Sequence, residues 1–149
     1  MVIRNEHEAL CVAVEMERRA IRVYERALML TKDEQVIAAL KEILAQEQEH
    51  FARFSAMQRE FPCDAATEQM LLQAMGADVL FQGGVMDMGR KDALSSVKGL
   101  YAYAADSEQQ AVETYLKYAD LCQNANVADV FRAIAAEEAM HHGELLRQV

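Results

Sequence analysis

One set of residues occurs twice in this chain, with the second copy 91 residues after the first. The first copy is Glu17, Tyr24, Glu47 and His50, and the second is Glu108, Tyr115, Glu138 and His141. In each copy the tyrosine lies 7 residues after the first glutamate, and the second glutamate lies 30 residues after the first glutamate. The histidine comes three positions after that. This repeat predicts two similar helical hairpins that face each other and direct four carboxylates and two imidazoles at one point.

The composition favours a helical domain without a nucleic-acid partner. The chain has 149 residues, enough for one domain with a full core, and it contains six glycines and a single proline, Pro62. Its formal net charge of −9 would repel a phosphate backbone. Four glutamates bound to two divalent cations would account for part of this acidity.

No export or membrane signal is evident in the sequence. The first residues lack a basic start followed by an apolar run, and no window contains the ~18 consecutive apolar residues of a membrane span. The cysteines Cys11, Cys63 and Cys122 are odd in number and form no C-x-x-C pair, which excludes a zinc knuckle. We therefore expect a cytoplasmic protein with reduced cysteines, which act as small hydrophobic residues.

Capping and breaking residues divide the chain into four long helices. Asn5 with Glu8 resembles an N-cap and its capping-box partner. A second helix is predicted from Thr31–Glu34 to about Glu60, before Pro62. A third is expected over about 92–122, and Asn126 with Asp129 should open the fourth. A short helix is expected over 67–75, with a break at Gly83-Gly84.

The connections between these helices predict the fold class. The links within each hairpin are short, so the two helices of a hairpin should be antiparallel neighbours, and one long connection joins the hairpins. We predict an all-α, ferritin-like four-helix bundle in a single domain covering 1–149. The first hairpin spans about 5–60, the crossover 62–91 and the second hairpin about 92–149.

Acidic residues interrupt the apolar faces of these helices. The stripe through Leu10, Val14, Ile21 and Tyr24 places Glu17 in the middle of a buried seam. Glu108 takes the same place between apolar residues of the third helix. Burying an unpaired carboxylate is costly, so each of these acids needs a compensating partner.

The spacing explains how six side chains could hold two metal ions. Residues three apart share a helix face, so Glu47/His50 and Glu138/His141 each offer an oxygen and a nitrogen together. The 30-residue step from Glu17 to Glu47 returns the chain to a similar height on an antiparallel helix. We predict that Glu47 and Glu138 bridge the ions, that Glu17 and Glu108 bind one ion each, and that His50 and His141 cap one each. Such ligands suit iron(II), manganese(II) or zinc and disfavour copper(I).

Other residues receive supporting or structural interpretations. Tyr24 and Tyr115 can reach a ligand carboxylate of the opposing hairpin, and they can equally be core tyrosines with satisfied hydroxyls. His7 and His142 are expected on the surface. The methionines of the crossover, Met70, Met75, Met86 and Met88, are expected to pack against the bundle or a second subunit.

The two hairpins resemble the rubrerythrin family of ferritin-like proteins. The phrases that carry the resemblance are EMERRAIRVYERAL, LAQEQEHFARF, DSEQQAVETYLKYA and AAEEAMHHGEL. The resemblance implies a four-helix bundle with a non-haem di-iron centre, often in a homodimer, that reacts with hydrogen peroxide or dioxygen. By position, the two Glu/Glu/His sets inherit the ligand role and the two tyrosines the supporting role.

The chain departs from the rubrerythrin pattern in two places. It contains no pair of C-x-x-C motifs for a rubredoxin-like module, so the electron donor is expected to be a separate protein. Peroxidase-type members also place an extra carboxylate one turn from the third-helix ligand, where this chain has Ala105 and Ala111. Asp106 and Glu113 lie nearby but project from other faces. The ligand exchange linked to that acid, and full peroxidase activity, therefore have no matching residue here.

Three functions follow from these patterns. The first is an oxidoreductase that reduces peroxide or O₂ at a centre of two iron ions, with manganese or zinc as alternatives. The second is iron(II) oxidation and iron handling, as in ferritins. The third is a structural or interaction bundle with a non-redox metal. The segment 79–88 is a candidate dimer face.

Overall fold

The computed structural model describes residues 2–76 and 96–148, and these residues form helices and no strand. The long helices are α1 (Glu6–Leu30), α2 (Glu34–Glu60), α4 (Val97–Leu121) and α5 (Ala125–Gln148). A shorter helix, which we call the crossover helix, covers 65–76 and agrees with the helix predicted over 67–75. The all-α prediction is confirmed for this part of the chain. The predictions for Gly83-Gly84, Met86, Met88 and the 79–88 dimer face lie outside the described residues.

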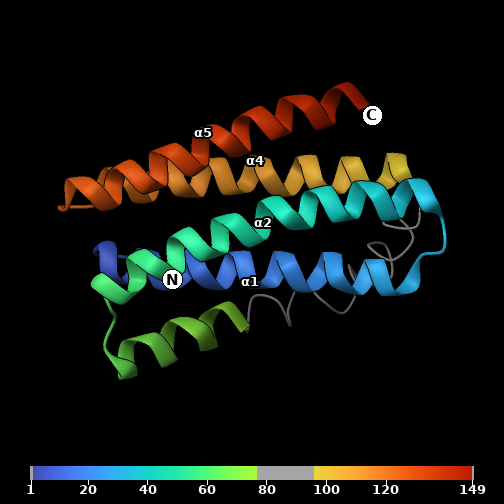
Figure 1. The fold of residues 1–149 in the computed structure, drawn as a ribbon. Helices are drawn as coiled ribbons and strands as arrows, with labels where there is room; N and C mark the ends of the chain where they lie inside the picture. Colours follow the sequence, from blue (N-terminus) through green and yellow to red (C-terminus); the bar gives the residue numbers. More distant parts are fainter. Residues whose placement is uncertain (1, 77–95, 149) are drawn as a thin grey trace.

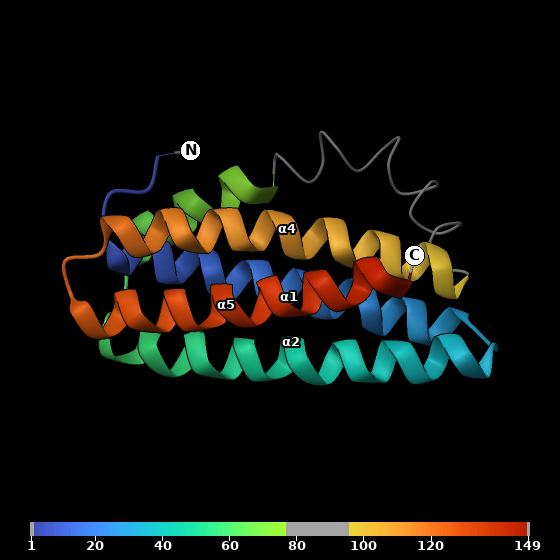
Figure 2. The same ribbon diagram turned by 90° about the horizontal axis from the view of Figure 1, so that it is seen from above.

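The four long helices lie side by side as two hairpins (Figure 1). α1 and α2 form one antiparallel pair, and α4 and α5 form the other (Figure 2). α2 and α4 run in the same direction, although they are neighbours among the long helices along the chain (Figure 1). α4 therefore begins at the end of the bundle opposite to the end of α2 (Figure 1). No helix among the described residues is long and apolar enough to cross a membrane.

The N-terminal caps were predicted correctly for one helix and misplaced by two residues for two others. Asn5 caps α1, and its side-chain oxygen accepts a hydrogen bond from the Glu8 backbone N–H at 3.0 Å. The cap of α2 is Asp33, not Thr31. The Asp33 side chain accepts hydrogen bonds from the backbone N–H groups of Gln35 and Val36. Thr31 is the C-cap of α1, and its side chain accepts from the Asp33 N–H at 3.2 Å.

The second hairpin shows the same kind of shift. α5 begins at Ala125, and its first N–H groups are bound by the Asn124 side chain, at 3.0 Å from Asn126 N and 3.1 Å from Val127 N. Asn126, which the sequence suggested as the cap, already belongs to the helix. Ser96 caps α4 by accepting from the Gly99 N–H at 3.0 Å. In each link several polar residues could cap, and the chain geometry of the tight turn selects one of them.

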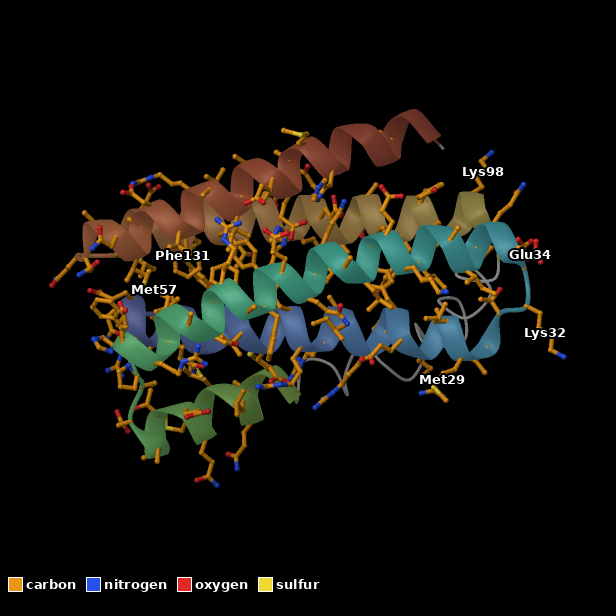
Figure 3. All side chains as sticks on the ribbon, in the orientation of Figure 1. Met29, Lys32, Glu34, Met57, Lys98 and Phe131 are labelled. Carbon is orange, nitrogen blue, oxygen red and sulfur yellow. The ribbon has the colours of Figure 1, made fainter. Side chains whose placement is uncertain are left out.

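The core has two apolar clusters. One contains Phe54, Tyr115 and Phe131, whose rings pack with centroid distances of 5.0–5.9 Å. Figure 3 shows Phe131 and Met57 toward one end of the bundle, and Met29, Lys32 and Glu34 at the opposite end. The crossover helix adds Leu71 and Met75 to this cluster, so its packing prediction is confirmed for Met75. Met70, by contrast, is exposed.

The second cluster lies on the other side of the acidic residues along the helices. It contains Tyr24 of α1, Leu40 of α2 and Leu100 of α4. On α1, for example, Glu17 falls between Val14 of the first cluster and Tyr24 of the second. Apolar layers therefore flank the acidic middle of the bundle on both sides along the helices.

Two histidines and the cysteines complete the comparison. His7 and His142 are half-buried, so the surface position predicted for them is confirmed only in part. Each contacts a backbone carbonyl through Nδ1 at 2.7 Å, His7 that of Pro62 and His142 that of Ala105. All three cysteines carry free thiols, and burial raises the pKa of Cys11 to about 12.

Candidate metal centre

Glu17 lies inside the bundle because it takes a seam position of α1. Glu17 is only 2% exposed. The Tyr115 hydroxyl of the opposite hairpin donates a hydrogen bond of 2.7 Å to Glu17 Oε1. This contact is the cross-hairpin role predicted for Tyr115.

α2 and α5 bring the Glu-x-x-His motifs face to face. His50 Nδ1 lies 2.9 Å from Glu138 Oε1, and both residues are 1% exposed. The imidazole rings of His50 and His141 stack at a centroid distance of 6.3 Å with an interplanar angle of 24°. The two histidines therefore meet in space, as their 91-residue offset predicts.

All six predicted ligands fall into two groups that share one residue. The first group consists of Glu17, Glu47, His50 and Glu138, and the second of Glu108, Glu138 and His141. Within each group, one candidate ligand atom per residue lies within 4.8 Å of the others. Glu138 belongs to both groups, which agrees with its predicted bridging position. Glu47, predicted as the other bridge, belongs to the first group alone.

The donor atoms of these groups are those that a metal pair would use. Glu17 Oε2, Glu138 Oε2 and His141 Nδ1 are buried and have no hydrogen-bond partner among the described residues. Buried polar atoms without a partner are rare because each costs free energy. Oxygen and imidazole nitrogen donors suit iron, manganese or zinc. The residues present therefore fit two such ions.

The pKa values of the cluster reflect several acids that are crowded together in a buried position. Burial, together with the neighbouring Glu47, raises the pKa of Glu17 well above its ordinary value. Burial is also the main cause of the raised pKa of Glu138, and its contact with His50 opposes the shift. For His50, burial alone would lower the pKa, but the Glu138 carboxylate outweighs it and raises the pKa. Bound cations would favour the deprotonated carboxylates and the neutral imidazole.

The two tyrosines occupy different environments despite their equivalent sequence positions. Burial raises the pKa of Tyr115 well above its ordinary value, and the Glu17 charge adds to the shift. Tyr24 is equally buried, and after burial the Glu47 charge is the next cause of its raised pKa. Its ring also packs edge-on against Tyr103 at 6.2 Å. Both hydroxyls thus stay protonated beside the acids.

Sequence reasoning missed one pair of residues next to the cluster. Arg53 Nη1 lies 2.5 Å from Glu137 Oε2, and Glu137 Oε1 lies 3.9 Å from His50 Nε2. Glu137 immediately precedes the predicted ligand Glu138, but a glutamate at that position is equally compatible with a solvated helix face. Only the approach of α2 to α5 shows that it faces His50.

Ala105 and Ala111, the two positions considered for the extra carboxylate, have different surroundings in the structure. Ala105 is buried, and its carbonyl contacts His142. Ala111 lines a cavity that also contains Glu17 and Glu108. Asp106 and Glu113 are exposed, as expected for acids on other faces. Ala111 is therefore the alanine of the two that faces the acids.

An all-helical protein with a buried cluster of carboxylates and imidazoles from four helices has the features of the di-metal carboxylate bundles. The comparison with protein families agrees. The family model named Rubrerythrin matches residues 100–149, which include Glu108, Tyr115, Glu138 and His141. This match confirms the predicted resemblance over the second hairpin. No curated protein and no solved structure matches the chain.

Proposed function

We propose that this protein is a ferritin-like di-metal oxidoreductase of the rubrerythrin type that reduces peroxide or O₂ with electrons from a separate donor protein. The observation that carries the proposal is the sharing of Glu138 by two ligand groups. A single carboxylate between two groups of donors is suited to a pair of ions and not to one. The parallel course of α2 and α4 supports the ferritin-like connection, in which one long crossover joins two hairpins.

Each ligand has a proposed place. Glu17, Glu47 and His50 would hold one ion, Glu108 and His141 would hold the other, and Glu138 would bridge them. Two iron ions are the proposed cofactor, and when bound they would supply electrons and Lewis acidity to the oxidant. The match to the rubrerythrin family model favours iron over manganese or zinc, which offer the same ligand preference.

The remaining residues would orient the ligands and enclose the site along the helices. Tyr115 holds Glu17 through a hydrogen bond from the opposite hairpin, which fixes the carboxylate relative to both halves of the bundle. The apolar clusters flank the acids on both sides along the helices. The resemblance and composition also lead us to propose a cytoplasmic homodimer.

The proposal is tested by anaerobic loading with iron(II), followed by rapid mixing with hydrogen peroxide or with O₂. We expect about two irons per chain and an absorption change on oxidation. Glu138→Gln should abolish binding of the pair because both groups lose a ligand. Glu137→Gln is the matched control, since it changes the adjacent residue, which contributes to neither group.

The outcomes separate the proposed reaction from its alternatives. A centre that binds iron but stays reduced in the presence of both oxidants would overturn the oxidoreductase. Ferric iron retained beyond two ions per chain would favour ferritin-like iron handling. Zinc bound tightly in place of iron, without any reaction, would favour a structural bundle.

A further inference from the structure

Among the described residues, a cavity of about 660 Å³ extends from the exposed Arg22 to the acidic cluster. Residues of α1 and α4 supply most of its lining, and Glu47 and Glu138 reach it from the other two long helices. Its volume lies in the range of cavities that hold small organic molecules and far exceeds what hydrogen peroxide needs. The cavity is therefore large enough for a bulkier ligand.

Two alanines keep the inner part of this cavity open. Ala20 follows Glu17 by three residues and Ala111 follows Glu108 by three, so each lies on the same helix face as its glutamate. Both alanines line the cavity. A longer side chain at either place would fill the space directly outside the carboxylates.

The walls of the cavity are partly apolar, and two arginines lie among the polar and acidic residues that complete its lining. Met16, Val23 and Met75 contribute apolar surface. Arg19 and Arg22 also line the cavity, and Arg22 is exposed. Arg19 donates a hydrogen bond of 2.9 Å to the Met75 carbonyl and contacts Glu15 at 3.2 Å, so its charge is partly compensated. Arg22 has no ion pair to any described residue within 4.0 Å.

Arginine at this mouth is notable in an acidic protein. The chain has a net charge of −9, yet four arginines lie between positions 18 and 26 of α1. Glu15 pairs with Arg18 and Arg19, which leaves Arg22 as the cation of the cavity mouth that can receive an external anion. An anionic group at Arg22 and an apolar body along the walls would satisfy both kinds of surface.

We propose that this cavity binds an organic anion with an apolar chain, its headgroup at Arg22 and its chain directed past Ala20 and Ala111 toward the acids. The further step rests on the proposed function: the substrate is then an organic hydroperoxide that carries an anionic headgroup. Its O–O bond is cleaved with two electrons from the donor protein and two protons. The products are the corresponding alcohol and one water molecule.

Binding is tested separately from turnover, by calorimetric titration with octanoate in the presence and absence of zinc, which is redox-inert. We expect saturable binding with one octanoate per chain. Arg22→Gln should weaken it about fivefold, because an exposed charge contact contributes modestly. Arg59→Gln removes the same charge from an exposed position of α2 outside the cavity and should leave binding unchanged.

A second variant tests the position of the chain without touching a charge. Ala111→Leu fills the inner cavity and should weaken octanoate binding about tenfold or more. Ala102→Leu, on an exposed face of α4, is its matched control. In turnover, Ala111→Leu should lower the preference for an anionic organic hydroperoxide over hydrogen peroxide, whereas Ala102→Leu should leave that preference unchanged.

Each result bears on one proposal. No octanoate binding, or binding that is insensitive to both Arg22→Gln and Ala111→Leu, overturns the cavity proposal while metal uptake and peroxide reaction stand. Octanoate binding in protein that takes up no metal leaves the cavity proposal intact and overturns the proposed function. If octanoate binds to the native protein but Ala111→Leu loses equal fractions of its activity toward hydrogen peroxide and toward the organic hydroperoxide, the substrate assignment is refuted.

Discussion

Replacing Glu17 by glutamine should make the metal-free protein more stable, although it removes a ligand. Glu17 is 2% exposed, its Oε1 accepts from Tyr115, and its Oε2 has no hydrogen-bond partner in the part of the chain that the structure describes. A glutamine keeps an oxygen for Tyr115, and its amide can donate to the neighbouring Glu47. The structure therefore predicts that a charge is removed from a place where it is poorly compensated.

The expected gain follows from the free energy of an unsatisfied buried polar group, about 1–3 kcal/mol. For a domain of this size, 1 kcal/mol shifts the melting temperature by about 2–4 °C. We expect Glu17→Gln to raise the melting temperature of metal-free protein by roughly 2–12 °C at pH 8, as measured by calorimetry or circular dichroism. In metal-loaded protein the sign should reverse, because the variant loses a ligand.

The same prediction has a definite pH dependence. The folded pKa of Glu17 lies above its ordinary value of 4.5, so the folded state binds the proton more tightly than the unfolded state. The stability that Glu17 contributes when protonated is present below about pH 4.5 and is lost as the pH rises through the raised pKa. The advantage of glutamine should thus be largest at pH 8 and shrink toward pH 5.

Glu15→Gln provides a matched control two residues away on α1. Glu15 is also buried, at 8% exposed, but it pairs with Arg18 and Arg19. Its replacement should lower the stability, by about 1 kcal/mol. Equal effects of the two substitutions, or a gain at Glu17 that does not depend on pH, would refute the reasoning about an uncompensated acidic cluster.

Three further predictions follow from single contacts. Tyr115→Phe leaves Glu17 Oε1 without its donor and should lower the free energy of unfolding in denaturant by about 1–3 kcal/mol at neutral pH. The control is Tyr118→Phe, in a tyrosine whose pKa is raised by burial alone, and it should cost less. Equal losses would contradict the role of the Tyr115 hydroxyl. Asn124→Ala removes the cap of α5 and should cost about 1 kcal/mol, whereas Asn126→Ala should be nearly neutral. Zinc uptake should release protons, which can be measured in weakly buffered solution. More protons should be released at pH 6 than at pH 8, since the pKa values of Glu17, Glu138 and His50 are raised. Zinc uptake without proton release would contradict those shifts.

The sequence was informative about the centre because its geometry is written in helical spacing. Glu47 and His50 share a face by their three-residue separation alone, and the 91-residue repeat relates them to Glu138 and His141. Helix periodicity fixes which side chains face inward, so the six candidate ligands could be predicted to converge, and the structure brings them into two groups.

Features that depend on the approach of distant helices could not be predicted. The proximity of Glu137 to His50 depends on how α5 lies against α2, which no local pattern encodes. The cavity at Ala111 likewise exists because α1 and α4 leave space between two small residues. The caps at Asp33 and Asn124 were missed for a local reason, since each short link offers several polar residues that can cap a helix.

The central claim is that these six residues hold a pair of metal ions, and metal content tests it most directly. Protein purified without added metal or chelator should contain about two irons per chain, and its spectrum should change after peroxide is added to the reduced protein. Glu138→Gln should lose the pair, while Glu137→Gln should retain it. Protein that binds no metal, even after anaerobic addition of iron(II), would contradict the account and leave the buried acids without a purpose.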